Sequence, residues 1–234
     1  VSAAWRISEE AFMEDLQSWV ANLKLRAGYG VTGNQSGIGE YKSAMLMGTG
    51  GGAYFDSESN SWKQSYGVTQ NPNPDLKWES TAQTNVGVDM FLFNRLNLTF
   101  DWYLKKTSDL LYTYQVPNPP YLYSSILANV GDLTNKGVEL TLGANLINHK
   151  DFTWDANLTL AHNKQTIDKL SNQVYQTDRI LSGSLQGILG MSNRYSQVIE
   201  EGYPVGTFYG PHCEGIVDGK FVLANDGEDE ILGN

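Results

Sequence analysis

The chain has 234 residues, of which 41% are hydrophobic and 18% charged, a composition typical of an ordered protein. Its formal net charge of -10 disfavours nucleic-acid binding and a basic membrane anchor, because both need a positively charged surface. The single cysteine, Cys213, excludes an internal disulfide, and the sequence holds no run of 18 apolar residues that would predict a membrane-spanning helix. The first residues show no leader pattern, so we expect a secretory signal to be absent or removed.

Alternation of apolar and polar residues begins at the N-terminus. Residues 1–7 and 23–31 carry apolar side chains at odd positions, which predicts two strands with one apolar face each. The segment between them, 8–20, is predicted to be a link with a short helix. Ser8 would cap this helix, with Phe12, Leu16, Trp19 and Val20 on one side.

Four further segments alternate in the same way, at residues 78–90, 96–104, 138–146 and 152–160. On each, uncharged side chains share one face and polar side chains share the other. Charged residues on the polar faces, which would be costly to bury unpaired, are Lys24, Arg26, Glu79, Asp89, Asp101, Glu139 and Asp155. We therefore expect the polar face to line a wet or plugged lumen.

Strand length separates two fold classes. The segment 78–90 alternates over 13 residues, whereas soluble strands usually have about 5–6 residues. At about 3.3 Å per residue it would reach about 43 Å, enough to cross the hydrocarbon core of a bilayer when tilted. The sequence favours an antiparallel transmembrane β-barrel segment of about six long strands. The alternative is a soluble β-sandwich, for example a carbohydrate-binding module.

The connections alternate between short and long. Tight turns are predicted at Asn94–Arg95 and at 147–150, and long loops at 33–77 and 107–136. Outer-membrane barrels have short periplasmic turns and long extracellular loops, which sets the expected direction of each strand. We expect residues 1–163 to hold the transmembrane strands and residues 164–234 to be mostly an extracellular loop region. Aromatic residues near the expected strand ends fit interfacial girdles or ordinary strand propensity, namely Trp78, Phe91, Phe93, Trp102 and Trp154.

Few residues suggest a site. Aromatic side chains in the long loops could stack on sugar rings, contact a partner or pack the loops, namely Trp62, Tyr66, Tyr121 and Tyr123. The histidines lack metal-ligand spacing, and the glycine-rich stretch 48–52 is not followed by the Lys-Ser/Thr of a phosphate loop. The acidic turn 225–230 resembles a solvated turn more than a metal site. We predict no catalytic residue, cofactor or metal site.

Several blocks resemble the SusC/RagA group of TonB-dependent receptors. They are VSAAWRISEEAFM, LKLRAGYGVTGNQ, NPNPDLKWESTAQTNVGVDMFLFNRLNLTFDWYLKKTSDLL, NVGDLTNKGVELTL, DFTWDANLTLAHNK and EEGYPVGTFYG, in the family's order. The sequence ANDGEDEILGN departs from the longer acidic loop of many members, which puts a calcium-binding role of Asp226, Glu228, Asp229 and Glu230 in doubt.

The resemblance implies a noncatalytic nutrient transporter of the Bacteroidetes outer membrane. Such a receptor forms a 22-stranded barrel with an N-terminal plug, pairs with a SusD-like surface lipoprotein and takes energy from TonB. It imports glycans, oligosaccharides or peptides. About six strands without plug or TonB box would leave open edges, which lipid does not tolerate. We therefore expect a C-terminal barrel fragment that does not transport alone.

Overall fold

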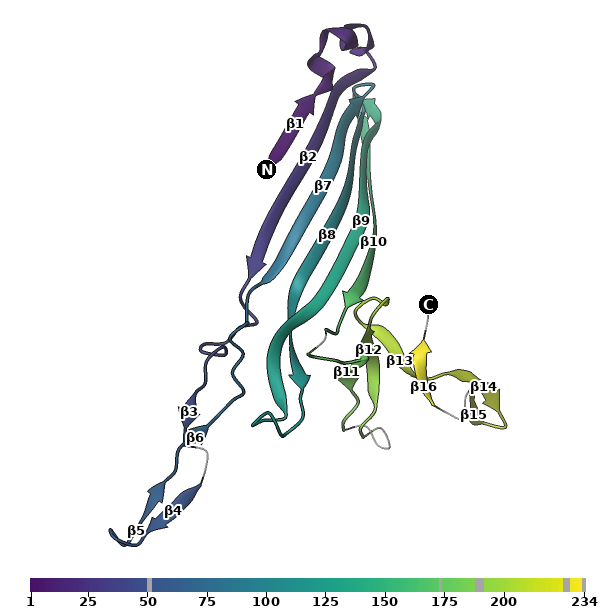
Figure 1. The fold of residues 1–234 in the computed structure, drawn as a ribbon. Helices are drawn as coiled ribbons and strands as arrows, with labels where there is room; N and C mark the ends of the chain where they lie inside the picture. Colours follow the sequence, from purple (N-terminus) through teal and green to yellow (C-terminus); the bar gives the residue numbers. More distant parts are fainter. Residues whose placement is uncertain (50–51, 173, 188–191, 225–227, 233–234) are drawn as a thin grey trace. The chain divides into compact units, whose positions relative to one another are not determined.

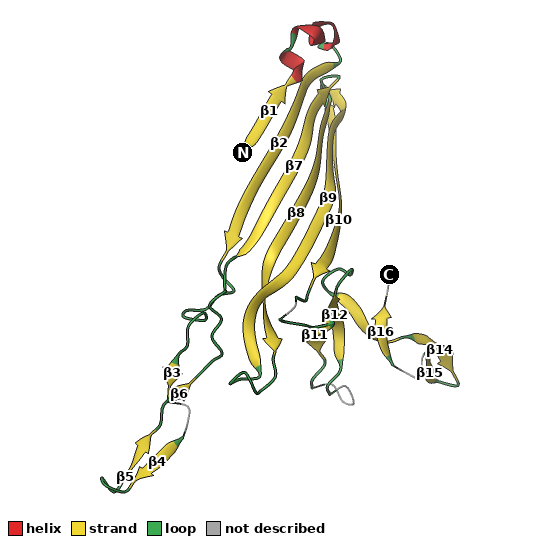
Figure 2. Ribbon diagram, in the orientation of Figure 1, coloured by secondary structure: helices red, strands yellow, loops and turns green. Residues whose placement is uncertain are grey.

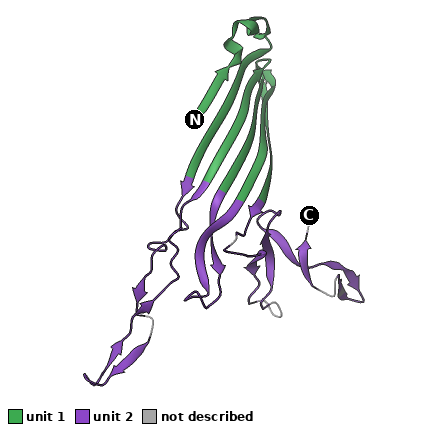
Figure 3. Ribbon diagram, in the orientation of Figure 1, with its two compact units in different colours: residues 1–32, 81–107, 133–166 green, residues 33–80, 108–132, 167–234 purple. Residues whose placement is uncertain are grey.

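The computed structural model describes residues 1–49, 52–172, 174–187, 192–224 and 228–232 (Figure 1). Strands dominate it, with two short 3-10 helices near the N-terminus (Figure 2). The chain divides into two compact units, one of residues 1–32, 81–107 and 133–166, and the other of 33–80, 108–132 and 167–234 (Figure 3). We call them unit 1 and unit 2 and describe each by itself.

The largest sheet has six strands in the order β1-β2-β7-β8-β9-β10. Their bounds are β1 (Ser2–Arg6), β2 (Val20–Asn34), β7 (Glu79–Leu92), β8 (Leu96–Gln115), β9 (Ser125–His149) and β10 (Phe152–Lys169). Neighbouring strands run in opposite directions, and apart from the short β1 each has at least 14 residues. The prediction of about six long antiparallel strands is confirmed.

The turn between β7 and β8 lies one residue earlier than predicted. Phe93 and Asn94 are its central residues, with φ of 54° and 51°, and the amide of Arg95 donates to Leu92 O at 3.0 Å. Two successive left-handed residues make a type I′ turn, whose twist matches that of the flanking strands. Phe93 is an unusual residue for this position, but its amide donates to Trp19 O at 2.8 Å and its ring lies 6.0 Å from that of Trp19.

The turn between β9 and β10 is also shorter than the predicted 147–150. The two strands extend to a two-residue connection, Lys150 and Asp151, the commonest length for a β-hairpin loop. The link between β1 and β2 holds two 3-10 helices, η1 (Ile7–Glu9) and η2 (Ala11–Leu16), instead of a capped helix. Ser8 is a buried residue inside η1, and no side chain caps either helix.

The long connection 33–77 forms two small hairpin sheets. One pairs β3 (Met47–Gly48) with β6 (Gly67–Val68), and the other pairs β4 (Ala53–Asp56) with β5 (Ser61–Gln64). The expected glycine-rich loop 48–52 falls partly outside the described residues.

The segment 107–136 contains much more strand than an irregular loop would. Strand β8 continues to Gln115 and β9 begins at Ser125, which leaves only residues 116–124 between them. The reason is a small hydrophobic core in unit 2, formed by Tyr114, Ile126, Ala128 and Val130 and covered by Val116, Tyr121 and Tyr175. Burying these side chains removes apolar surface from water, which favours continued pairing of β8 with β9.

The segment after β10 also folds into strands. A four-stranded sheet has the order β11-β12-β13-β16, and β14 pairs with β15. The bounds are β11 (Arg179–Ser184), β12 (Tyr195–Glu200), β13 (Thr207–Pro211), β14 (Cys213–Val217), β15 (Lys220–Leu223) and β16 (Asp229–Leu232). Residues 164–169 belong to β10.

Unit 1 has no hydrophobic core of its own. Among its described residues, Met13 is the only buried hydrophobic side chain. The apolar faces of its strands are exposed, as shown by Leu25, Val86, Phe100, Val138, Leu158 and Leu160. A soluble sandwich would bury this face against a second sheet, so the sandwich alternative is not supported.

Candidate functional site

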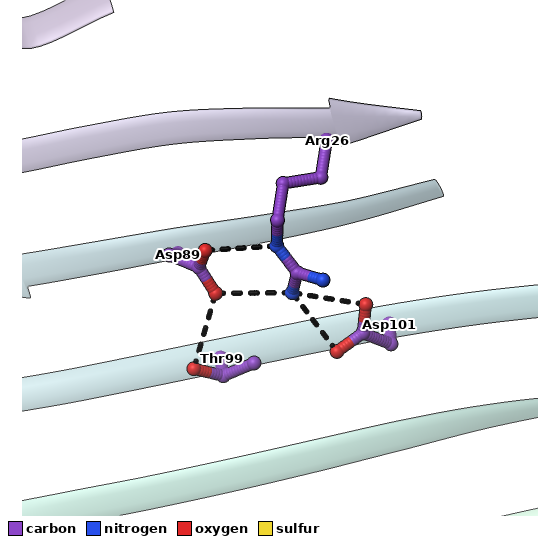
Figure 4. A network of polar contacts seen from close by, with 4 residues as sticks. All are labelled: Arg26, Asp89, Thr99 and Asp101. Carbon is purple, nitrogen blue, oxygen red and sulfur yellow. Dashed lines mark hydrogen bonds and ion pairs between the residues drawn. The ribbon is translucent and has the colours of Figure 1, made fainter. Parts of the chain in front are cut away.

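The polar face of unit 1 carries an ion-pair network that joins three strands (Figure 4). Arg26 lies on β2, Asp89 on β7 and Asp101 on β8. The guanidinium donates from Nε to Asp89 Oδ2 at 2.8 Å and from Nη2 to Asp89 Oδ1 at 3.0 Å. Its Nη2 also lies 3.1 and 3.0 Å from the two carboxylate oxygens of Asp101. Thr99 Oγ1 donates to Asp89 Oδ1 at 3.3 Å.

A glycine makes this reach across the sheet possible. The strand order β2-β7-β8 means that Arg26 must cross β7 to meet Asp101. Gly87 of β7 lies under the crossing, and a Cβ built on it would be 2.8 Å from Arg26 Nη2 and closer still to Asp101 Oδ1. Any larger residue would therefore displace the guanidinium or the carboxylate. Sequence alternation identified the polar face and not this arrangement.

Other glycines of the polar face leave room for neighbouring polar side chains. A Cβ on Gly28 would meet Asn85 Oδ1 at 2.6 Å, and one on Gly137 would meet Tyr103 Oη at 2.7 Å. Hydrogen bonds between strands add to the network, with Thr81 and Thr107 hydroxyls at 2.9 Å and Asn145 Nδ2 donating to Asp155 Oδ1 at 2.7 Å. The polar side chains thus lie along the sheet and make a hydrophilic wall.

Two depressions mark this wall. One of about 640 Å³ includes Arg26, Gly28, Gln83 and Asn85 in its lining. The other, of about 250 Å³, is lined by Gln83, Asn85, Asp101, Trp102, Tyr103, Lys105 and Glu139. Such a surface can hold water or hydrogen-bond a polar partner.

The aromatic residues that were predicted in the long loops fall into an exposed pair and a packed pair. Trp62 is 70% exposed on the β4–β5 hairpin, where its ring packs edge-on against Phe55 at 5.6 Å, and Tyr66 is also exposed. Tyr121 covers the hydrophobic core of unit 2, and Tyr123 donates its hydroxyl to Val68 O at 2.5 Å. Tyr121 and Tyr123 therefore have packing roles, while Trp62 and Tyr66 remain available to a ligand or partner.

An ion pair closes the same hairpin. Asp56 pairs with Lys63 across the two strands and accepts a hydrogen bond from Ser59 Oγ at 2.7 Å. The hydrogen bond from Lys63, followed by those from the turn residues, holds the pKa of the Asp56 carboxyl below its usual value. In the core of unit 2, burial raises the pKa of the Tyr175 hydroxyl.

Three asparagines, which we call the Asn clamp (Asn71, Asn73 and Asn129), attach the end of the long connection to the first residues of β9 and the residues just before it. Asn71 Nδ2 donates to Tyr123 O at 2.6 Å and to Ser125 O at 2.8 Å, and Asn73 Nδ2 donates to Leu127 O at 2.8 Å. Carbonyls of alternate strand residues point to the same edge. The two side-chain amides therefore take the place of the backbone donors of a neighbouring strand, from Tyr123 just before β9 to Leu127 within it.

The sequence explains why side chains and not backbone amides make these hydrogen bonds. Pro72 and Pro74 have no amide hydrogen, so the segment cannot pair as an ordinary strand, and the side chains of Asn71 and Asn73 supply the donors instead. Asn129 completes the clamp, since its Oδ1 accepts from Lys77 N at 2.9 Å and its Nδ2 donates to Lys77 O at 2.7 Å. The signal was the repeated Asn-Pro at 71–74, but its partner lies about 50 residues away along the chain.

We predict that Asn71→Ala loosens this attachment. Asn71 is buried and its Oδ1 accepts from the amides of Leu122 and Tyr123, both at 3.1 Å. Losing these bonds, at about 1 kcal/mol each, should speed hydrogen exchange at those two amides by about tenfold or more. Mass spectrometry of the exchanged protein measures this. Asn163→Ala, at an exposed position, serves as control, and equal exchange in both variants would contradict the clamp.

The remaining candidates are His212, Cys213 and the acidic turn 225–230. His212 Nδ1 lies 3.1 Å from Glu230 Oε1, Arg194 pairs with Asp229 at 2.5 Å, and Cys213 is exposed. Of the acidic turn 225–230, residues 225–227 with Asp226 lie outside the described residues. Within the described part of the chain, no cluster of three metal-ligating side chains occurs. No described helix is both long and apolar enough to cross a membrane.

Comparisons with known proteins agree on the family that this chain resembles. Residues 1–228 match the family of TonB-dependent receptor-like β-barrels. TonB-dependent receptor P39 of Formosa agariphila is 35% identical over 90% of this chain, and TonB-dependent receptor SusC of Bacteroides thetaiotaomicron is 32% identical over 89%. The chain spans 18% and 20% of these two relatives.

Solved structures agree with the family match. The RagAB peptide importer in its open-open state superimposes with a TM-score of 0.74 over the full chain, at 26% identity. Its closed-closed state gives a TM-score of 0.71 over 98% of the chain, at 27% identity. In both cases this chain covers 24% of the matched protein. The matched names are those of receptors and importers, in agreement with the expectation that the chain is not an enzyme.

Proposed function

The chain belongs to the TonB-dependent receptor-like β-barrel family, and from that premise we propose that it forms part of the wall of an outer-membrane nutrient importer. The observation that carries this proposal is the two-faced sheet of unit 1. Uncharged side chains are exposed on one face, while Arg26, Asp89 and Asp101 pair on the other. Contact with lipid would make the exposure of the uncharged face favourable, and contact with a polar lumen would make the exposure of the charged face favourable.

The complete receptor would contain parts beyond these 234 residues. Large outer-membrane transporters close about 22 strands around a plug, so the edges at β1 and β10 would pair with further strands. In this proposal the plug and the TonB-contacting segment lie in the rest of the receptor. The long connections with Trp62 and Tyr66 face outward, towards a SusD-like surface lipoprotein that acts as a lid.

The proposed cargo is a glycan, an oligosaccharide or a peptide that is too large for a porin. The likeness to SusC and to a peptide importer supports this range and does not narrow it. The hydrophilic wall with its ion-pair network suits passage of a polar solute. Selectivity would come from the outer connections together with the lid.

The orientation can be tested with epitope insertions in the full-length receptor in its own cells. An epitope placed in the β4–β5 turn, between Asp56 and Ser61, should bind antibody on intact cells. The same epitope between Lys150 and Asp151 should bind only after the outer membrane is permeabilised. Equal labelling of both positions on intact cells, or recovery of the receptor in the soluble fraction, would contradict the proposal. Loss of growth on defined glycans or peptides after gene deletion then identifies the cargo.

A further inference from the structure

The link between β1 and β2 is much larger than its position in the sheet requires. The β7–β8 and β9–β10 hairpins at the same end of unit 1 turn within two or three residues, whereas η1, η2 and their flanks take up residues 7–19. Two-residue connections suffice for antiparallel neighbours. The additional residues therefore need another explanation.

The link is well attached to the sheet. Phe93 N donates to Trp19 O at 2.8 Å, Trp5 Nε1 donates to Glu10 Oε1 at 2.8 Å, and Gln17 Nε2 donates to Ser8 O at 3.2 Å. Ser8 and Met13 are buried. The side chains that it leaves outside are consequently presented in fixed positions.

Three of those outer side chains, Phe12, Leu16 and Trp19, are large and apolar, and they lie among exposed polar and acidic residues, namely Glu9, Glu14, Asp15, Gln17 and Ser18. Phe12 is 66% exposed and Trp19 is 64% exposed, and Leu16, Phe93 and Trp5 are exposed as well. We call these five residues the rim cluster. A cluster of this kind at the end of a sheet usually marks an interaction surface, because its contact with water is unfavourable.

Continuity with the apolar face of the strands indicates what covers the rim cluster. On β2 the odd-numbered residues, such as Leu23 and Leu25, form the apolar face, and Trp19 continues that series at the strand's start. On β1, Trp5 shares the odd positions with Ala3. Tryptophan and phenylalanine at the end of a lipid-facing strand favour the region between hydrocarbon and headgroups.

The link also carries four acidic residues, Glu9, Glu10, Glu14 and Asp15. Glu9 pairs with Arg6, and Glu10 accepts the hydrogen bond from Trp5. In a 3-10 helix, residues three apart share a side, so Glu14 lies on a different side of η2 from both Phe12 and Leu16, whereas the exposed Asp15 shares the side of Phe12. Glu14 can thus stay in water while Phe12 and Leu16 contact the headgroup region, where Asp15 would lie beside Phe12 among hydrated polar groups.

We propose that residues 7–19 form an interfacial anchor, which inserts Phe12, Leu16 and Trp19 into the headgroup region of the bilayer at the short-turn end of the barrel. The proposal rests on the membrane-barrel function given above. It gives the enlarged link a role in setting the depth of this part of the barrel wall in the membrane.

The test uses the full-length receptor in lipid vesicles, with Cys213→Ser as background and a nitroxide label on one introduced cysteine at a time. Labels at Phe12→Cys and Leu16→Cys should be relaxed more strongly by oxygen, which concentrates in lipid, than by a water-soluble nickel chelate. A label at Glu14→Cys, the matched control in the same helix, should show the opposite ratio.

Leu158→Cys, on the exposed apolar face of β10, separates two ways to fail. If it reports lipid while positions 12, 14 and 16 all report water, the interfacial anchor is contradicted and the membrane-barrel function is still supported. If Leu158→Cys itself reports water, the proposed function fails too. Labels at 12 and 16 that neither reagent reaches would show a protein contact instead of lipid and would also overturn the anchor.

Discussion

Gly137→Ala is expected to destabilise the barrel wall by about 1–3 kcal/mol or more, the usual range for overpacking. A Cβ at this position would lie 2.7 Å from His162 O on β10 and 2.7 Å from Tyr103 Oη on β8. The tyrosine could swing away, but the carbonyl belongs to the neighbouring strand and cannot move without disturbing the ladder. We therefore expect the sheet itself to shift.

Resistance to SDS before and after heating, together with urea unfolding in detergent, measures this effect on the full receptor. Gly30→Ala is the matched control, because Gly30 lies on the polar face of β2 and, apart from its chain neighbours, no described residue has an atom within 4 Å of the added Cβ. Gly30→Ala should unfold like the parent protein. If the two alanine variants unfold at the same urea concentration, the close packing at Gly137 does not limit stability.

Arg26→Ala is expected to be the second large loss, of about 1–3 kcal/mol, because it leaves two carboxylates facing each other without their cation. The side chains of Arg26, Asp89 and Asp101 keep 30%, 27% and 28% of their exposure, so water moderates the cost without removing it. Adding Asp89→Asn and Asp101→Asn to the alanine variant should recover part of the stability, since the repulsion then disappears.

Arg6→Ala provides the comparison for the charge change. Arg6 pairs with Glu9 at 2.6 Å, but both side chains are more than 60% exposed, so its removal should change the unfolding free energy by less than about 0.5 kcal/mol. Urea unfolding of Arg26→Ala, of Arg6→Ala and of the triple variant measures these differences in unfolding free energy. An Arg26→Ala protein as stable as Arg6→Ala would mean that the network contributes nothing to folding.

The long strands could be predicted because the alternation has a single cause. Where one face meets an apolar solvent and the other meets water, every second residue is constrained along the whole strand, as in residues 78–90. The alternation weakens where β9 passes through Asp132, Thr134 and Lys136, and the sequence therefore suggested a loop there. The small core around Tyr114 and Ile126 sustains pairing beyond that point, which requires tertiary contacts to recognise.

The candidate site was only half predictable for the same reason. Residue pattern placed Arg26, Asp89 and Asp101 on polar faces, but their pairing depends on strand register across 63 and 75 residues. The turn at Phe93 was displaced because its conformation depends on contacts with Trp19. Local propensity cannot supply such long-range information.

The Asn clamp has a consequence for the chain before it reaches the membrane. An exposed strand edge invites pairing with other molecules, and this hazard is greatest while a barrel is still unassembled. Pro72 and Pro74 occupy the edge of β9 without offering backbone donors of their own, so no further strand can be added through them. We therefore expect the segment to protect this edge from aggregation during assembly.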